Sequence, residues 1–108
     1  MTKEFGKITR VYVGMGGYQG VQFGIWFLFE GKGWGCGDGR GFWSFPPSSG
    51  AKWTVEDQTK AFGEMSHYII GLLEQAKKTK VEDLKDIPVE CTFEGTRLAS
   101  WRILEEVL

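Results

Sequence analysis

The sequence is poor in the residues that build metal centres and disulfide frameworks. Its 108 residues include two cysteines, Cys36 and Cys91, and one histidine, His67. A structural zinc site needs four closely spaced ligands, and a disulfide-stabilised small domain needs several cysteine pairs. We therefore expect no metal and no cofactor, and we interpret both cysteines as small buried hydrophobic residues. The sequence leaves open whether they lie close together in space, as a redox pair requires.

Long hydrophobic runs are also lacking. The longest unbroken apolar stretch, Ile25 to Phe29, is far short of the roughly 20 residues that a membrane span needs, and the N-terminal residues do not resemble a signal peptide. Disorder is excluded, because 42% of the residues are hydrophobic and five are tryptophans. We expect one cytoplasmic domain over residues 1–108 that makes no contact with membranes.

Positive and negative charges are nearly balanced. The sequence also lacks a catalytic motif. Thirteen basic residues against 14 acidic ones give a net charge of −1, without the basic stripe of a dedicated nucleic-acid-binding protein. The glycines at 14, 16, 17 and 20 do not complete GxGxxG, because Gln19 takes the last position, and no Walker motif occurs. His67 has no serine or cysteine placed to act as its nucleophile. We therefore expect no enzymatic activity.

Glycine and aromatic residues dominate the first 45 positions and indicate β structure. Three strands are expected, at about residues 7–13, at 21–30 and in the glycine-rich segment after residue 33. In the second strand, the odd-numbered positions form one apolar face that we assign to the core: Val21, Phe23, Ile25, Phe27 and Phe29.

The third strand has glycine at every second position from 31 to 41, so one of its faces lacks side chains. The opposite face carries Trp34, Cys36, Asp38, Arg40 and Phe42. Because glycine weakens a strand, something must approach the bare face closely. Either the protein's own helix or aromatic side chains cover it, or a ligand or partner backbone does.

A long helix and a final hairpin complete the expected fold. Thr54 is a good N-cap with Asp57 three residues on, the C-terminal end is marked by Lys77 to Lys80, and the stripe on one face comprises Phe62, Met65, Ile69, Leu72, Leu73 and Ala76. Pro88 begins a hairpin that turns at Glu94 and Gly95 and returns over residues 97–107. On this last strand two alternating sets compete for the core, and we assign to it Ala99, Trp101, Ile103 and Val107 in preference to Leu98, Leu104 and Leu108, which alternate with Arg102.

The predicted architecture is therefore an α+β two-layer sandwich: an antiparallel sheet of about five strands in the order βββαββ, with one long helix on one face. The sheet half is mildly basic and rich in aromatic residues, and an arginine beside stacking rings suits a nucleotide-like ligand. The expected ligand-binding or partner-binding residues are Tyr18, Gln19, Trp26, Trp34, Asp38, Arg40 and Trp43.

Three segments resemble small uncharacterised proteins encoded by bacteriophages and prophages. They are Lys7-Ile8-Thr9 with Gly16-Gly17-Tyr18-Gln19-Gly20, the run Gly31-Lys32-Gly33-Trp34-Gly35, and the stretch from Pro88-Val89-Glu90 to Ser100-Trp101-Arg102-Ile103-Leu104. The resemblance implies a phage source, a host-cell cytoplasmic location and a binding role, such as inhibition of a host defence system.

Three interpretations of function remain open at this point. The first is a non-enzymatic binding protein that holds a host protein or a small nucleotide-like ligand. The second is an accessory protein for single-stranded nucleic acid, which the charge balance does not favour. The third is a homo-oligomeric structural module, a homodimer for example, that self-associates through Trp26, Leu28 and Trp34.

Overall fold

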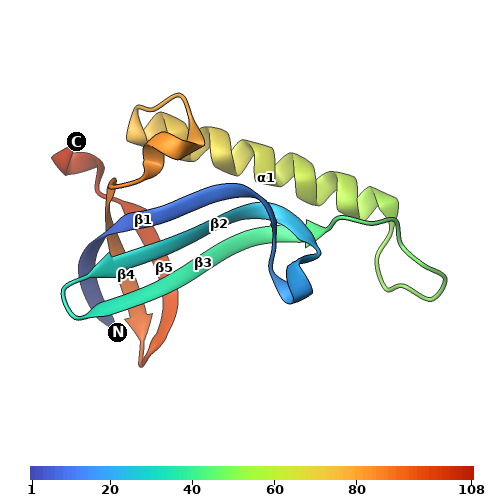
Figure 1. The fold of residues 1–108 in the computed structure, drawn as a ribbon, viewed down its shortest axis with the longest axis horizontal. Helices are drawn as coiled ribbons and strands as arrows, with labels where there is room; N and C mark the ends of the chain where they lie inside the picture. Colours follow the sequence, from blue (N-terminus) through green and yellow to red (C-terminus); the bar gives the residue numbers. More distant parts are fainter.

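A five-stranded antiparallel sheet and one long helix make up the fold. The computed structural model describes residues 1–108, and its strands lie side by side in the order β3-β2-β1-β4-β5 (Figure 1). This arrangement confirms the α+β class and the βββαββ order. The elements are β1 (Thr2–Gly16), η1 (Tyr18–Gly20), β2 (Gln22–Gly31), β3 (Trp34–Trp43), α1 (Val55–Ala76), η2 (Val81–Leu84), β4 (Pro88–Glu94), β5 (Arg97–Ile103) and η3 (Glu105–Val107), where η denotes a short 3₁₀ helix.

The core face of β2 agrees with the alternation in the sequence. Ile25, Phe27 and Phe29 are buried, with Phe27 and Phe29 stacked at 5.8 Å between ring centroids. Val21, just before the strand, and Phe23, near its start, are only partly covered. The predicted face is therefore confirmed at its centre, and it opens toward one end of the molecule.

Strand β1 is longer than predicted, and a bulge at Thr9 changes which of its residues face inward. Ile8 pairs with Phe29 and Arg10 pairs with Leu28, so Thr9 is the extra residue. Without the bulge, Ile8 and Arg10 would share the inner face. With it, Val11 lies opposite Phe27 and joins buried Ile8 on the core side.

Helix α1 begins where its capping residues predict. The Thr54 hydroxyl accepts a hydrogen bond from the Asp57 backbone N–H at 3.1 Å, and the Asp57 carboxylate accepts one from the Thr54 N–H at 2.8 Å, so the capping box is complete. The helix ends at Lys77, whose φ of 58° is left-handed. Its buried residues are Met65, Leu72 and Ala76, which all belong to the predicted stripe.

The sheet curls strongly, so the β4–β5 hairpin passes behind β2 and β3 in Figure 1. Although β3 and β5 are opposite edges of the sheet, the Trp101 indole N–H of β5 donates to the Asp38 carboxylate of β3 at 2.8 Å. Trp101 also packs on Phe27 and Phe29, with ring centroids 5.0 and 4.8 Å apart. The curl closes the core on the side that α1 leaves open.

The last strand is shorter than predicted. It ends at Ile103, and residues 105–107 form η3 instead of continuing the strand. Val107, a core residue by the sequence alternation, is 64% exposed, whereas Leu104 is buried. A register shift between Thr92 and Phe93 also turns Leu98, instead of Ala99, toward the core. A break in pairing of this kind leaves no mark in the hydrophobic pattern of a single strand.

The molecule is elongated and exposes a large surface. Its extents are 47 × 33 × 20 Å and its accessible area is 7073 Å². A monomer of 12.2 kDa typically exposes about 6,100 Å². None of its helices has the length and apolar character that crossing a membrane requires.

Candidate functional site

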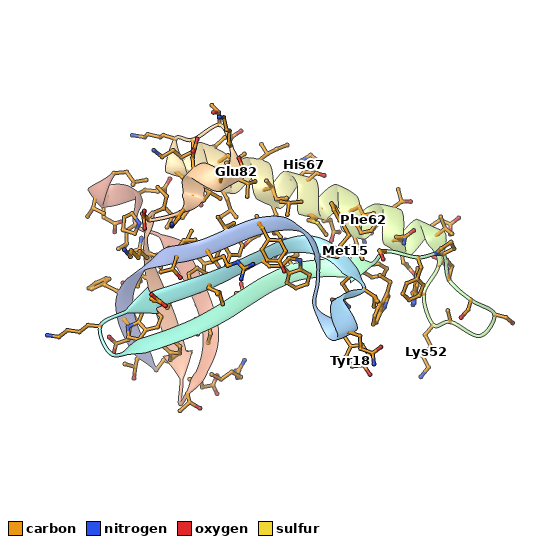
Figure 2. The ribbon with its side chains drawn as sticks, in the orientation of Figure 1. Met15, Tyr18, Lys52, Phe62, His67 and Glu82 are labelled. Carbon is orange, nitrogen blue, oxygen red and sulfur yellow. The ribbon has the colours of Figure 1, made fainter.

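An apolar groove lies between the second half of β1 and the first half of α1. It has a volume of about 510 Å³ and is lined by Val13, Met15, Phe23, Ser44, Phe62, Met65, Ser66 and Ile69. Met15 of β1 and Phe62 of α1, two of these lining residues, are labelled in Figure 2. Val13, Met15 and Phe23 are 42, 48 and 39% exposed, so the groove is open to solvent. We call it the β1–α1 groove.

The edge of β1 beside this groove has no neighbouring strand. Strand β4 pairs with β1 only over Thr2 to Lys7. At Ile8 the backbone still has partners, since its N–H donates to the Ile87 carbonyl at 3.0 Å and its carbonyl accepts from the Asp86 N–H at 2.7 Å. Beyond the bulge, β1 is paired with β2 alone, up to Gly16. The groove is therefore bordered by a free strand edge.

The alternation of an antiparallel ladder decides which backbone groups face that edge. The Ser44 N–H donates to the Val21 carbonyl, so odd-numbered β2 residues direct their backbone groups toward β3 and even-numbered ones toward β1. The β1 residues opposite the even-numbered ones are Tyr12, Gly14 and Gly16. Val11, Val13 and Met15 therefore direct N–H and C=O groups outward, beside their own apolar side chains. Of these groups, the Met15 carbonyl accepts a hydrogen bond from the Tyr12 hydroxyl at 3.4 Å.

A chain of aromatic rings connects the groove to one end of the molecule. The successive ring-centroid distances, from 5.3 to 6.5 Å, link Tyr18, Trp43, Phe45, Trp53, Phe42, Phe62 and Phe23. Gln58 of α1 anchors the loop, because its side-chain amide donates to the carbonyls of Trp43 at 2.6 Å and Phe45 at 3.1 Å. Tyr18 and Phe45 remain 67 and 45% exposed, so this aromatic end extends the apolar surface of the groove.

The predicted binding residues fall into separate places. Tyr18 and Trp43 meet in the aromatic end, and Gln19 adjoins them in η1 with a left-handed φ of 53°. Asp38 and Arg40 lie on the concave face of β3. Trp26 lies on the opposite, convex face. Trp34 packs against Phe93 near the β2–β3 turn, at 5.3 Å between ring centroids. The structure thus does not bring the seven together in one site.

Trp26 accounts for two of the alternating glycines. Its indole lies across Gly39 and Gly41, and a methyl group added at either position would overlap the ring. The Trp26 indole N–H donates to the Gly14 carbonyl at 3.0 Å, which fixes the ring in this position. Gly35 and Gly37 have no aromatic cover and lie on the exposed part of the strand. The protein's own aromatic side chain therefore covers one half of the bare face, and the other half is open.

The charged pair of β3 is held by contacts within the concave face. The Arg40 guanidinium lies 4.0 Å from the centroid of the Tyr68 ring of α1, and Asp38 accepts the hydrogen bond from Trp101. Burial, together with the Asp38 charge, raises the pKa of Tyr68 to about 12. The Tyr68 phenol therefore stays protonated at neutral pH and acts as a packing surface for Arg40.

The two cysteines lie next to each other inside the curled sheet. Cys91 is fully buried and Cys36 half-buried, and both are free thiols. Burial and the neighbouring Cys36 thiol raise the pKa of Cys91 to about 12, and burial also raises the pKa of Cys36. Both groups stay protonated, and a protonated thiol is a poor nucleophile and a poor metal ligand.

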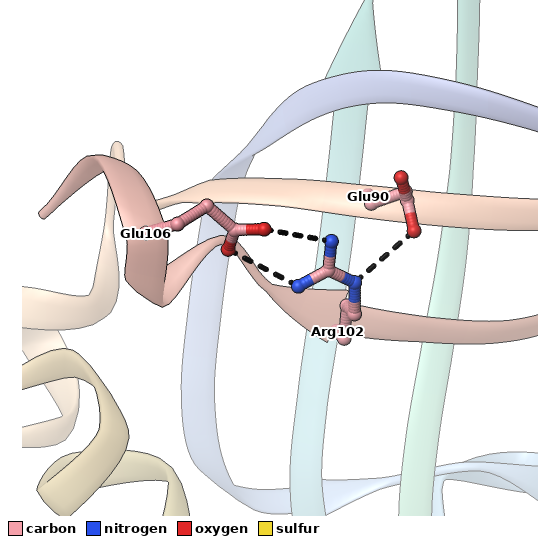
Figure 3. Close-up of polar contacts among 3 residues, drawn as sticks. All are labelled: Glu90, Arg102 and Glu106. Atoms are coloured by element: carbon pink, nitrogen blue, oxygen red, sulfur yellow. Dashed lines mark hydrogen bonds and ion pairs between the residues drawn. The ribbon is translucent and has the colours of Figure 1, made fainter.

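The other polar groups are occupied with each other or scattered. Arg102 of β5 donates to Glu90 at 3.1 Å and makes a two-pronged contact with Glu106 at 3.0 and 3.1 Å, which fastens η3 to the sheet (Figure 3). Hydrogen bonding from Arg102 holds the pKa of Glu106 below its usual range. No group of three or more metal-binding side chains is present, and His67 is exposed on α1.

Sequence reasoning missed the residues of the groove. The first predicted strand ends at Val13 and does not include Met15. The available signal was the apolar alternation of Val11, Val13 and Met15 after Thr9, which continues the strand into the glycine-rich segment. What the arrangement offers chemically is apolar contact combined with backbone hydrogen bonding.

Comparisons of the chain with protein-family models, with curated proteins and with solved structures found no match.

Proposed function

We propose that this chain is a non-enzymatic binding protein that takes an extended segment of a partner protein along the β1–α1 groove. One observation carries the proposal: the outward N–H and C=O groups of Val11 and Val13 in β1 and an apolar hollow lie side by side. An added strand gains main-chain hydrogen bonds from such an edge, and its alternate side chains fill the pocket beside it.

The chemistry of the groove favours a peptide over a nucleotide. Six of its eight lining residues are hydrophobic, and none is charged. Arg40, the cation expected to accompany stacking rings, is packed on Tyr68, apart from the aromatic end. A nucleotide phosphate would find no cation in the groove. The proposal is compatible with inhibition of a host protein, which stays a prediction from the resemblance to phage proteins.

The test is selection from a displayed library of random peptides, followed by binding measurements on the enriched sequences. Enriched peptides should carry apolar residues at alternate positions. Met15→Glu should weaken their binding by at least about tenfold, because it places a charge in the hollow. Leu28→Glu is the matched control: Leu28 is 46% exposed, much as Met15 is, and lies on the other face of the sheet.

A second variant tests the backbone part of the proposal. The Val13 N–H faces the free edge, so Val13→Pro removes a donor without breaking a bond inside the sheet. We expect this variant to remain folded and to bind the enriched peptides at least about tenfold more weakly. Enrichment of no peptides, or of peptides that bind Met15→Glu and the parent equally, would overturn the proposal.

A further inference from the structure

Strand β3 forms the other free edge of the sheet, and glycines supply its outward backbone groups. The bond between Ser44 and Val21 sets the alternation, so the even-numbered β3 residues face β2. Gly35, Gly37, Gly39 and Gly41 therefore direct N–H and C=O groups away from the sheet. An exposed strand edge of this kind is a template for pairing with another chain.

One end of this edge is already closed. The Trp43 carbonyl accepts the 2.6 Å hydrogen bond from Gln58, so the free stretch ends before Trp43. From Gly35 to Gly39 the strand residues other than Cys36 are exposed. Gly35 and Gly37 put no side chain of their own on the convex side of this stretch, whereas Gly39 lies under the Trp26 ring.

Asp38 and Arg40 have hydrogen-bonding capacity that the chain does not use. The Asp38 Oδ2 atom accepts from Trp101, whereas its Oδ1 atom has no partner. Arg40 contacts the Tyr68 ring and takes part in no ion pair or side-chain hydrogen bond. The two side chains lie two residues apart on one face, but Asp38 is turned to Trp101 and Arg40 to Tyr68, and no ion pair joins them.

A second copy of β3 satisfies both groups in one register. If two antiparallel β3 strands cross at Gly39, Gly39 lies opposite its own copy and Gly37 lies opposite Gly41, which are outward-facing residues on both sides. Asp38 of each copy then lies directly opposite Arg40 of the other. If the two-fold axis instead passes through position 38, the two Asp38 side chains lie opposite each other, and if it passes through position 40, the two Arg40 side chains do. The charges thus select this register.

We propose that two copies of this chain pair through β3 about a two-fold axis at Gly39, forming a continuous ten-stranded sheet with two Asp38–Arg40 ion pairs. This interface leaves the β1–α1 groove of both copies open, so it does not depend on the proposed function.

The test uses charge reversal and sedimentation velocity over a concentration series. The parent should sediment as a dimer of the 12.2 kDa chain. Asp38→Lys and Arg40→Glu should each raise the dimer dissociation constant more than about tenfold, because each places two like-charge pairs in the interface. Circular dichroism and thermal melting establish that each variant is folded.

Mixing the two variants is the decisive step. The lysine introduced at position 38 of one chain then lies opposite the glutamate introduced at position 40 of the other, and the unchanged Arg40 lies opposite the unchanged Asp38. A heterodimer should therefore form where neither variant forms a homodimer. The double variant Asp38→Lys/Arg40→Glu should dimerise by itself for the same reason. A parent that stays monomeric at all concentrations, variants that dimerise like the parent, or a mixture and a double variant that both stay monomeric would overturn the proposal.

Two further readouts separate this proposal from the proposed function. Leu28→Glu should remove self-association through the convex face, and dimers lost only in that variant would assign the interface to the face with Trp26, against the β3 pairing. Binding of the selected peptides to Asp38→Lys should equal their binding to the parent, since Asp38 lies outside the groove. Failure of dimerisation therefore leaves the groove untouched.

Discussion

The Trp26 ring fits on the convex face because the residues beneath it, Gly39 and Gly41, have no side chains. Its ring needs the space above Gly39 and Gly41, and its N–H needs the Gly14 carbonyl. Three strands therefore cooperate in holding one indole. A tryptophan held in this way buries a large apolar area on the convex face without a second layer of structure.

A comparison of two glycines tests this arrangement. Gly39→Ala should lower the free energy of unfolding by about 1 to 3 kcal/mol, since the added methyl group overlaps the Trp26 ring. Gly37→Ala meets only the Phe27 carbonyl at 3.2 Å and Leu28 at 3.3 Å, and should be within about 1 kcal/mol of the parent. Urea unfolding measures both, and equal losses would contradict the role assigned to the Trp26 ring.

The raised pKa values of the Tyr68 phenol and the Cys91 thiol predict a loss of stability at alkaline pH. The pKa values of Tyr68 and Cys91 rise to about 12 in the folded chain, from 10.0 and 9.0. The unfolded state therefore releases these protons first, so stability is fully present below pH 9 and falls between pH 9 and about 12. Thermal melting recorded at a series of pH values measures this loss. In Cys91→Ala the melting temperature should fall less steeply just above pH 9 than it does in the parent. An unchanged slope would exclude Cys91 as a cause.

At the scale of the element, β1 is two different strands joined at Thr9. Its first half is interior to the sheet, between β2 and β4, and its second half is an edge. Hydrogen exchange should reveal the difference. The amides of Val11, Val13 and Met15 should exchange much faster than those of Tyr12 and Gly14, which donate to β2. Uniform protection along the strand would mean that another group covers the edge.

The start of α1 is the element boundary that the sequence specifies best. Thr54→Ala removes the capping hydroxyl and should cost about 1 kcal/mol in urea unfolding. Thr59→Ala, an exposed change inside the same helix, is the control and should be neutral or slightly stabilising. A larger loss at position 59 than at 54 would argue against the cap.

The helix was predictable because all its signals are local. Thr54, Asp57 and the Phe62 to Ala76 stripe lie within 23 consecutive positions and agree with one another. The bulge at Thr9 and the register shift at Phe93 were not predictable, because each is defined by a partner strand. The core face of β2 could be identified because β2 runs without such a break from Gln22 to Gly31.

For the whole molecule, the curl of the sheet decides what surrounds the core. Asp38 and Trp101 are 63 residues apart in sequence and at opposite sheet edges, and no local pattern could have joined them. No local pattern could have predicted the β1–α1 groove either. Its residues come from β1, β2 and α1, and its open edge depends on β4 ending its pairing with β1 at Lys7. Of the seven predicted binding residues, only the neighbours Tyr18, Gln19 and Trp43 lie together near it.

Trp101, which closes the curled sheet over the core, should contribute more to the free energy of unfolding than a surface contact does. Trp101→Ala removes a ring that packs on Phe27 and Phe29, and we expect it to cost about 3 to 5 kcal/mol. Trp101→Phe keeps most of the packing but loses the hydrogen bond to Asp38. It should lower the free energy of unfolding by about 1 kcal/mol for the lost hydrogen bond, in addition to the cost of the smaller ring. Chemical denaturation separates the two contributions, and a harmless Trp101→Ala would mean that β5 does not close the core.

The single extra residue at Thr9 also sets how the gene can change. Deleting codon 9 would remove the extra residue and still leave Arg10 opposite Leu28 and Val11 opposite Phe27, so the side chains from Arg10 to Gly16 would keep their faces. A deletion beyond the bulge, in the regular part of β1, would instead turn the residues that follow it to the other face. A deletion of one residue in the exposed Ser48–Gly50 segment would shift no strand. The open reading frame therefore tolerates the loss of a codon in that loop and at codon 9, and resists it in the regular part of β1.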